Sequence, residues 1–312
     1  MSQQPIVMDE VAIPLCIRRD AVSHATPLPL SDLYRRRFRR PLLHRKRMMA
    51  QIDAAHAEYQ AKMPKNVPIH KLSFRYWQPN HAMIIGAEGN GLGLMVNTWL
   101  LRALQSKMRV VYITCSSMQH YGRLLLRAAQ SMDIEGVIHR ERCQAEWSNI
   151  ALNVYEPHRF KDEQEAINFV DGCLGHLNLC NEHTIVVLDH WFYEPDHLAS
   201  LLRKHLDNWS GQPIHFWLLG QNQNMFLSPA LQWFRQQCTF IAWKRIEHYG
   251  MDGFMDKELL DRLRHANLHD VVMQMHGSSS FEGVVGPAVA FGVDDSGYDE
   301  LLTLLYNLLR ER

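Results

Sequence analysis

The chain lacks the features that would place it in a membrane or hold it together with disulfide bonds. No stretch of its 312 residues approaches the ~20 consecutive apolar positions that a membrane-spanning helix requires. Its six cysteines are scattered without paired spacing, which favours a reducing compartment. The first residues, Met-Ser-Gln-Gln-Pro, lack the charged and apolar segments of a secretory signal. These absences predict a cytoplasmic protein without a membrane span.

A net charge is also absent, because 33 basic residues balance 33 acidic ones. The balance conceals one dense basic segment, since residues 35–47 contain no acid. Its basic residues are Arg35, Arg36, Arg37, Arg39, Arg40, Arg45, Lys46 and Arg47. Such a segment predicts contact with nucleic-acid phosphates, an acidic protein partner or an anionic membrane surface, in that order of preference. The last of these would hold the protein peripherally at the inner membrane.

The chain divides into two regions of different pattern. Residues 1–34 contain four prolines and no sustained periodicity, which predicts an extended arm. Apolar residues at helical spacing then predict a helix over Leu42–Met63, and two prolines after it mark a boundary. We therefore expect a basic, helical N-terminal extension over residues 1–68 and a second domain over residues 69–312.

In this second domain, apolar segments alternate with amphipathic ones. The amphipathic segments predict helices, the last of them leucine-rich over residues 298–312. The apolar segments are too uniformly apolar to have one wet face, so they predict a mainly parallel sheet covered by helices on both sides, a three-layer α/β domain. The predicted strands are Ala82–Ile85, Val110–Cys115, Ile150–Val154, Thr184–Asp189, Ile214–Leu219, Thr239–Trp243, Val271–Met275 and Ala288–Phe291.

A glycine-rich loop separates the first of these strands from a predicted helix. Gly86 and Gly91 have the spacing of the P-loop pattern G-x-x-x-x-G-K-[ST], but Leu92 replaces the lysine and Gly93 replaces the metal-ligating hydroxyl residue. Glycines let backbone N–H groups surround an anion at a helix N-terminus, whereas the lysine and the hydroxyl hold the phosphates and their metal. The loop therefore predicts a degenerate nucleotide site, and the alternative is a tight turn that never bound a nucleotide. Its residues are Gly86, Gly89, Asn90, Gly91, Leu92 and Gly93.

Polar residues end two further predicted strands. Asp189 ends one of them, where P-loop proteins place an aspartate that holds the magnesium shell, and the residue after it is commonly a water-polarising glutamate. Here that next residue is His190. Gln221 follows another buried strand and could sense a γ-phosphate in a RecA-like core. The alternative is that Asp189 caps a loop or helix and that Gln221 binds the backbone of its own loop.

The order and spacing of these segments resemble the FtsK/HerA superfamily of P-loop ATPases, which includes DNA translocases and the coupling ATPases of conjugation and type IV secretion. Residues 79–101 resemble its first nucleotide motif and residues 184–189 its second. Residues 212–221 resemble the strand that leads to its sensor glutamine, and residues 238–243 the strand that follows. The likeness covers about residues 75–295. It implies a RecA-like P-loop domain that works with the protein subunits of a transport machine, as an oligomer or hetero-complex, with DNA as a further partner.

The departures from the family pattern fall where its chemistry takes place. Leu92, Gly93 and His190 replace the expected residues, whereas Asp189 and Gln221 match them. Because these losses together remove most transition-state stabilisation, we expect a non-hydrolysing scaffold or substrate-coupling subunit of a conjugation, type IV secretion or DNA-translocation machine. It would need no cofactor and no metal, and binding of ATP without a firmly held metal stays open. The alternatives are a weakly active ATP-driven DNA translocase and a nucleic-acid-binding adaptor that acts through the arginine-rich arm.

Overall fold

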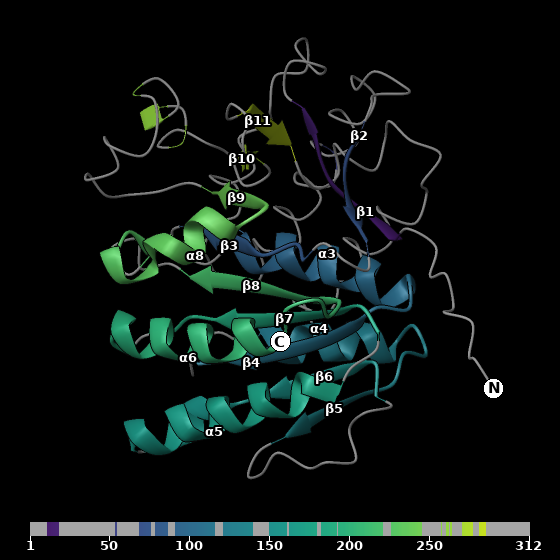
Figure 1. The fold of residues 1–312 in the computed structure, drawn as a ribbon. Coiled ribbons are helices and arrows are strands. Elements are labelled where there is room, and N and C mark those ends of the chain that lie inside the picture. Colours follow the sequence, from purple (N-terminus) through teal and green to yellow (C-terminus); the bar gives the residue numbers. More distant parts are fainter. Residues whose placement is uncertain are drawn as a thin grey trace, which may run out of the picture.

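One sheet of eleven strands runs through the molecule, in the order β2-β1-β11-β10-β9-β3-β8-β7-β4-β6-β5 (Figure 1). The computed structural model describes residues 11–18, 54, 69–75, 79–86, 91–115, 121–139, 150–160, 162–179, 182–191, 193–220, 226–244, 257, 260–261, 263, 270–276 and 281–284. The strands are β1 (Val11–Arg18), β2 (Ile69–Phe74), β3 (Ala82–Ile85), β4 (Arg109–Thr114), β5 (Gly136–His139), β6 (Leu152–Tyr155), β7 (Thr184–Asp189), β8 (Ile214–Gly220), β9 (Phe240–Trp243), β10 (Asp270–Met275) and β11 (Phe281–Val284).

Helices cover both faces of this sheet. The α-helices are α3 (Leu92–Gln105), α4 (Tyr121–Gln130), α5 (Glu163–Gly175), α6 (Pro195–Asn208) and α8 (Gln232–Gln237). Short 3₁₀ turns lie at η3 (Pro157–Arg159), η4 (His176–Leu179) and η5 (Pro229–Leu231). Figure 1 shows α5, α6 and α8 together on the face of the sheet toward the viewer. No helix in the described part of the chain is both long and apolar enough to span a bilayer.

The strands from β9 to β5 are all paired in parallel, and β10, β11, β1 and β2 continue the sheet in antiparallel pairs. Alternate residues of the parallel strands enter two separate cores. Ile84 and Val187 face α3 and α4, whereas Ile85 and Val186 face α5, α6 and α8. Burial on both faces explains why these strands are apolar throughout. The predicted three-layer, mainly parallel α/β fold is confirmed.

The N-terminal region contributes a strand that the sequence did not predict. Residues 11–18, predicted as part of an extended arm, form β1, which pairs with β2 and β11. The Trp99 side chain on α3 donates a hydrogen bond from Nε1 to the Leu15 carbonyl at 2.9 Å, and Leu15 is fully buried. The register shifts between Pro14 and Cys16, and this irregularity obscures the alternation that identifies a strand.

Other predicted elements lie outside the described residues. These are the arginine-rich segment, nearly all of the helix predicted over Leu42–Met63, the strand Ala288–Phe291 and the helix over residues 298–312. They stay predictions.

Candidate nucleotide site

The glycine-rich loop lies between a central strand and a helix N-terminus, as the sequence predicted. Strand β3 lies between β8 and β9, and the chain leaves it at Gly86, whose N–H donates to the Gly220 carbonyl at 3.2 Å. The chain enters α3 at Gly91, which has a φ of 82° and accepts a hydrogen bond from the Met95 N–H at 3.0 Å. That left-handed conformation favours glycine. Gly89 and Asn90, the other predicted loop residues, lie outside the described residues.

The amino end of α3 keeps the features of an anion cradle. Gly91 provides no side-chain cap, and no acid occupies the first turn. The first N–H groups of a helix have no partner within the helix and carry the positive end of its dipole. The amino end of α3, from Gly91 onward, is therefore suited to an anion.

The position of the missing lysine is part of the hydrophobic core. Leu92 is only 4% exposed and belongs to the core formed by α3, α4 and the sheet, together with Met95 and Val96. A lysine ammonium at this position would have to leave that core to reach a phosphate.

The position of the missing hydroxyl residue has no room for any side chain. A Cβ atom built on Gly93 would lie 2.4 Å from the ring of Tyr121, the first residue of α4. The Tyr121 carbonyl accepts a hydrogen bond from Asn97 Nδ2 at 3.0 Å, which ties the start of α4 to α3. The aromatic ring therefore occupies the space beside α3 in which a serine or threonine side chain would stand.

Asp189 lies at the end of β7 with both carboxylate oxygens engaged by side chains. The Tyr112 hydroxyl on β4 donates to Oδ2 at 2.7 Å, and His190 Nδ1 is hydrogen-bonded to Oδ1. The aspartate is 1% exposed. The pKa of Tyr112 is raised well above its ordinary value, first by the burial of Tyr112 itself and then by the charge and the hydrogen bond of Asp189. His190 has a φ of 57°, and its N–H donates to the Leu219 carbonyl at 2.9 Å. A left-handed conformation is uncommon for a non-glycine residue and often marks a functional position.

The predicted strand ends meet at one edge of the sheet. The order β3-β8-β7 places Gly86, Gly220 and Asp189 on three neighbouring strands at the carboxyl edge, where ligands of α/β folds bind. Gln221 follows β8 directly but lies outside the described residues, so its role as a sensor stays a prediction.

Lys244 is a further charged residue at this edge that the sequence reasoning missed. It follows β9 directly, is 1% exposed, and donates its N–H to the Ile85 carbonyl at 2.7 Å. Ile85 pairs with Trp243, so Lys244 stands beside Gly86 at the start of the loop. Strand alternation places its Cβ on the same face as Ala242, the face that α3 covers. A lysine that ends an apolar strand is the sequence signal that would have identified it.

A magnesium–nucleotide complex does not fit these residues. Gly93 supplies no hydroxyl, the Tyr121 ring fills the space beside it, and each carboxylate oxygen of Asp189 already has a hydrogen-bond partner, Tyr112 or His190. In the part of the chain that the structure describes, no three His, Cys, Asp or Glu side chains are grouped as metal ligands. Among the described residues, the amino end of α3 suits an anion, whereas the protein's own side chains occupy the positions expected to serve a metal.

Sheet order, loop and helix together define a RecA-like P-loop fold, which is the fold that the resemblance to FtsK/HerA-type ATPases implied. VirB4 of Thermoanaerobacter pseudethanolicus superposes with a TM-score of 0.54 at 10% identity, over 72% of this chain and 95% of that one. This identity shows a shared fold alone.

Two other similar structures have lower TM-scores. The genome packaging NTPase B204 of Sulfolobus turreted icosahedral virus 2, in complex with ATP-gammaS, gives 0.46 at 8% identity over 66% of this chain and 98% of that one. EssC (ATPases 2 and 3) of Geobacillus thermodenitrificans gives 0.44 at 12% identity over 78% of this chain and 46% of that one. No protein-family model matches the sequence, and no curated protein matches it.

Proposed function

We propose that this protein is a non-hydrolysing, P-loop ATPase-like subunit that scaffolds a secretion or DNA-translocation machine or couples substrate to its active ATPases. The VirB4-like fold supports the class of machine. The observation that carries the loss of hydrolysis is that the protein's own side chains close the metal side of the loop, with the Tyr121 ring against Gly93 and the Tyr112 hydroxyl on Asp189.

The closed metal side opposes catalysis energetically. In phosphoryl transfer the lysine and the metal stabilise the charge that develops on the phosphates, and catalysis depends mainly on this electrostatic stabilisation. A metal that displaced Tyr112 from Asp189 would break a buried hydrogen bond. Leaving that hydroxyl unsatisfied costs about 1–3 kcal/mol before any metal is bound.

The remaining cradle supports a narrower binding function. The amino end of α3 suits a phosphate group, and the backbone of Lys244 lies beside the first glycine of the loop. We therefore propose that a nucleotide, if one is held, is held without a firmly bound metal. The proposed partners are other subunits of the machine and DNA, and the arginine-rich segment is the proposed site for DNA or an acidic partner.

A phosphate-release assay tests the proposal. The full chain is incubated with Mg-ATP, with and without single- and double-stranded DNA, beside the matched variant Asp189→Asn. We expect both proteins to release phosphate at the same background rate. Turnover by the native chain that Asp189→Asn abolishes, with the variant still folded by circular dichroism, would establish the weakly active translocase instead.

Calorimetry provides a second, independent measurement. ATP is titrated into the native chain in the presence of magnesium and in the presence of a chelator. We expect the two titrations to give the same affinity, or no measurable heat in either. A magnesium-dependent gain in affinity would show that the chain supplies metal ligands that the described residues do not provide.

A further inference from the structure

A buried carboxylate with two arginines lies at the carboxyl edge of β6, away from the glycine-rich loop. Glu156 follows β6 directly and is 2% exposed. Arg123 on α4 binds it in a bidentate manner, with Nε at 2.5 Å from Oε1 and Nη2 at 2.9 Å from Oε2. Arg159 at the end of η3 approaches from the next segment, with Nε at 2.6 Å from Oε2.

Arg159 is not needed to neutralise the Glu156 carboxylate or to give its oxygens hydrogen-bond donors. Arg123 alone gives each oxygen of Glu156 a charged donor, and one bidentate pair is electrically neutral. Burial alone would raise the pKa of Glu156, but the hydrogen bonds and charges of Arg123 and Arg159 lower it to about 2. The carboxylate is thus ionised at neutral pH, and one positive charge is left unbalanced within the cluster.

The two guanidinium groups are partly exposed to solvent and have N–H groups that Glu156 does not use. The side chains of Arg123 and Arg159 are 33% and 39% exposed. Within the described residues, the terminal nitrogens Nη1 and Nη2 of Arg159 make no hydrogen bond or ion pair, and Nη1 of Arg123 makes none. A guanidinium held at Nε and open at both terminal nitrogens can still offer a pair of parallel donors.

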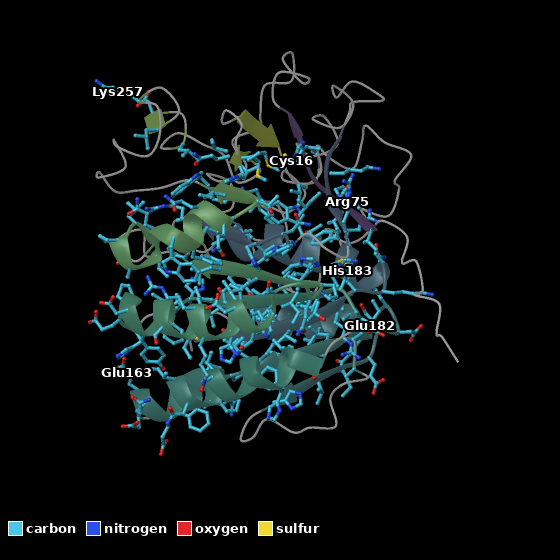
Figure 2. All side chains as sticks on the ribbon, in the orientation of Figure 1. Cys16, Arg75, Glu163, Glu182, His183 and Lys257 are labelled. Atoms are coloured by element: carbon cyan, nitrogen blue, oxygen red, sulfur yellow. The ribbon has the colours of Figure 1, made fainter. Side chains whose placement is uncertain are left out.

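The first two described acids that follow η3 along the chain are engaged elsewhere. Asp162 caps α5 by accepting a hydrogen bond from the Glu165 N–H at 2.9 Å. Glu163 lies 3.5 Å from His197 Nδ1. Figure 2 shows Glu163 at the end of the molecule opposite Glu182 and His183, which precede β7, so η3 and the start of α5 lie at the carboxyl edge of the sheet.

We propose that Arg123 and Arg159 form a phosphate-binding site at the carboxyl edge of β6, with Glu156 as the residue that positions both guanidinium groups. Guanidinium groups match the geometry of phosphate oxygens and bind them in pairs. The order β7-β4-β6 places this site two strand spacings, ~10 Å, from Asp189 along the same edge. The phosphate belongs either to a nucleic-acid strand or to a free polyphosphate.

Binding measurements on the full chain distinguish this proposal from a purely structural ion-pair cluster. The variant Arg159→Gln removes one donor pair and leaves the bidentate Arg123–Glu156 contact intact. Its control is Lys107→Gln, which removes the same charge from an exposed residue between α3 and β4, at the opposite edge. One probe is inorganic pyrophosphate, followed by calorimetry, and the other is a fluorescent single-stranded oligonucleotide, followed by anisotropy over a range of salt concentrations.

We expect Arg159→Gln to weaken one of the two probes about tenfold or more, and Lys107→Gln to leave it within about twofold. For the oligonucleotide, losing one phosphate contact should reduce the salt slope by about 0.7. Arg159→Lys should recover only part of the affinity, because it keeps the charge without the paired donors. An effect on pyrophosphate identifies a free polyphosphate, and an effect on the oligonucleotide alone identifies a nucleic-acid strand.

The proposal is overturned if neither probe binds the native chain, or if Arg159→Gln and Lys107→Gln bind alike. Equal melting temperatures of these two variants show that a difference in affinity does not come from unfolding. Binding at the glycine-rich loop or the arginine-rich segment does not confuse the comparison, because neither variant alters them.

Discussion

Mild acidification should destabilise this protein before its carboxylates are protonated, because three buried histidines are held neutral at the amino edge of the sheet. His81 Nδ1 accepts a hydrogen bond from the Phe216 N–H at 3.0 Å, and His215 Nδ1 accepts one from the Asn80 N–H at 3.0 Å. His215 Nε2 is paired with His183 Nδ1, also at 3.0 Å. Because His215 accepts at Nδ1, its neutral form donates from Nε2 to His183. Protonation would place a hydrogen on Nδ1 of His215 or of His183, so that this nitrogen could no longer accept its hydrogen bond.

The size of the effect follows from the depressed pKa values. Burial lowers the pKa of His81 from 6.5 to about 4, and the pKa values of His183 and His215 are lowered in the same direction, first by burial. A lowered histidine pKa means that the unfolded chain binds protons that the folded chain does not. Stability is therefore complete above about pH 6.5 and falls as pH drops toward the folded-state pKa. For His81 alone the loss is about 2 kcal/mol at about pH 5 and about 3 kcal/mol in full.

Denaturant unfolding between about pH 7.5 and about pH 5 measures this loss, with His81→Gln as the matched variant. The glutamine amide oxygen can accept the Phe216 N–H but cannot titrate. We expect the variant to be less stable at neutral pH and to lose about 2 kcal/mol less than the native chain on acidification. Glu156 and Asp171 contribute little in this window, because their ordinary pKa values of 4.5 and 3.8, near which their loss of stability would begin, lie below pH 5 and the folded chain lowers them further.

Parallel pH profiles for the native chain and His81→Gln would refute the reasoning. That result would mean that His81 is protonated in the folded state without cost. Figure 2 shows the labelled member of the group, His183, beside Glu182 and close to Arg75 in this view, at the amino edge. The Glu182 carboxylate is paired with Arg109 at 2.9 Å. Because salt screens such a pair, the pH dependence should be measured at constant ionic strength.

Two further predictions concern the closed metal side of the loop. Gly93→Ala should destabilise the native chain by about 1–3 kcal/mol, because the added Cβ meets the Tyr121 ring. In a Tyr121→Ala background the same change should instead stabilise α3 by up to about 1 kcal/mol. Denaturant midpoints measure this reversal of sign, and equal effects in both backgrounds would contradict the contact. Tyr112→Phe should cost about 1.5–3 kcal/mol because it removes a hydrogen bond to the buried Asp189 carboxylate, and an unchanged unfolding free energy would show that this bond contributes nothing.

The fold was predictable where the sequence is uniformly apolar. Strands β3 and β7 have the predicted bounds, Ala82–Ile85 and Thr184–Asp189. These strands are buried on both faces, so nearly every position requires an apolar residue, and the resulting apolar run can be recognised in the sequence. The position of the glycine-rich loop between β3 and α3 followed from the same pattern.

Strands with mixed polarity were missed. Strand β5 is a four-residue edge strand whose first three residues are half-buried, and β1 contains Pro14 beside its register shift. Such strands depend on their neighbours in the sheet, which a local pattern does not reveal. Strand β2 carried a usable signal, since Leu72 and Phe74 are buried while Lys71 and Ser73 are exposed.

The sequence predicted where the candidate site lies, but not which side chains fill it. The motif itself shows that Leu92 and Gly93 replace the expected residues. The side chains that fill the site come from other parts of the chain, and the motif does not reveal them. Tyr121 contacts Gly93 from the next helix, and Tyr112 reaches Asp189 across 77 residues of sequence. Side chains of this kind carry no motif of their own, so the sequence alone left a weakly active enzyme open.

These long-range contacts bear on that choice more directly than the missing lysine does. A lost lysine can be replaced by a cation from another element, and Lys244 already stands beside Gly86. In the proposed function, a ligand from another element does not restore metal binding in the same way, because the Tyr121 ring stays against Gly93 and Asp189 keeps its partners Tyr112 and His190. Restoring Leu92→Lys and Gly93→Ser together would therefore place a cation in the core and a hydroxyl against an aromatic ring. If the proposed loss of hydrolysis is right, we expect activity to require changes at Tyr121 and Tyr112 as well, because these side chains occupy the space and the carboxylate oxygen that a metal would use.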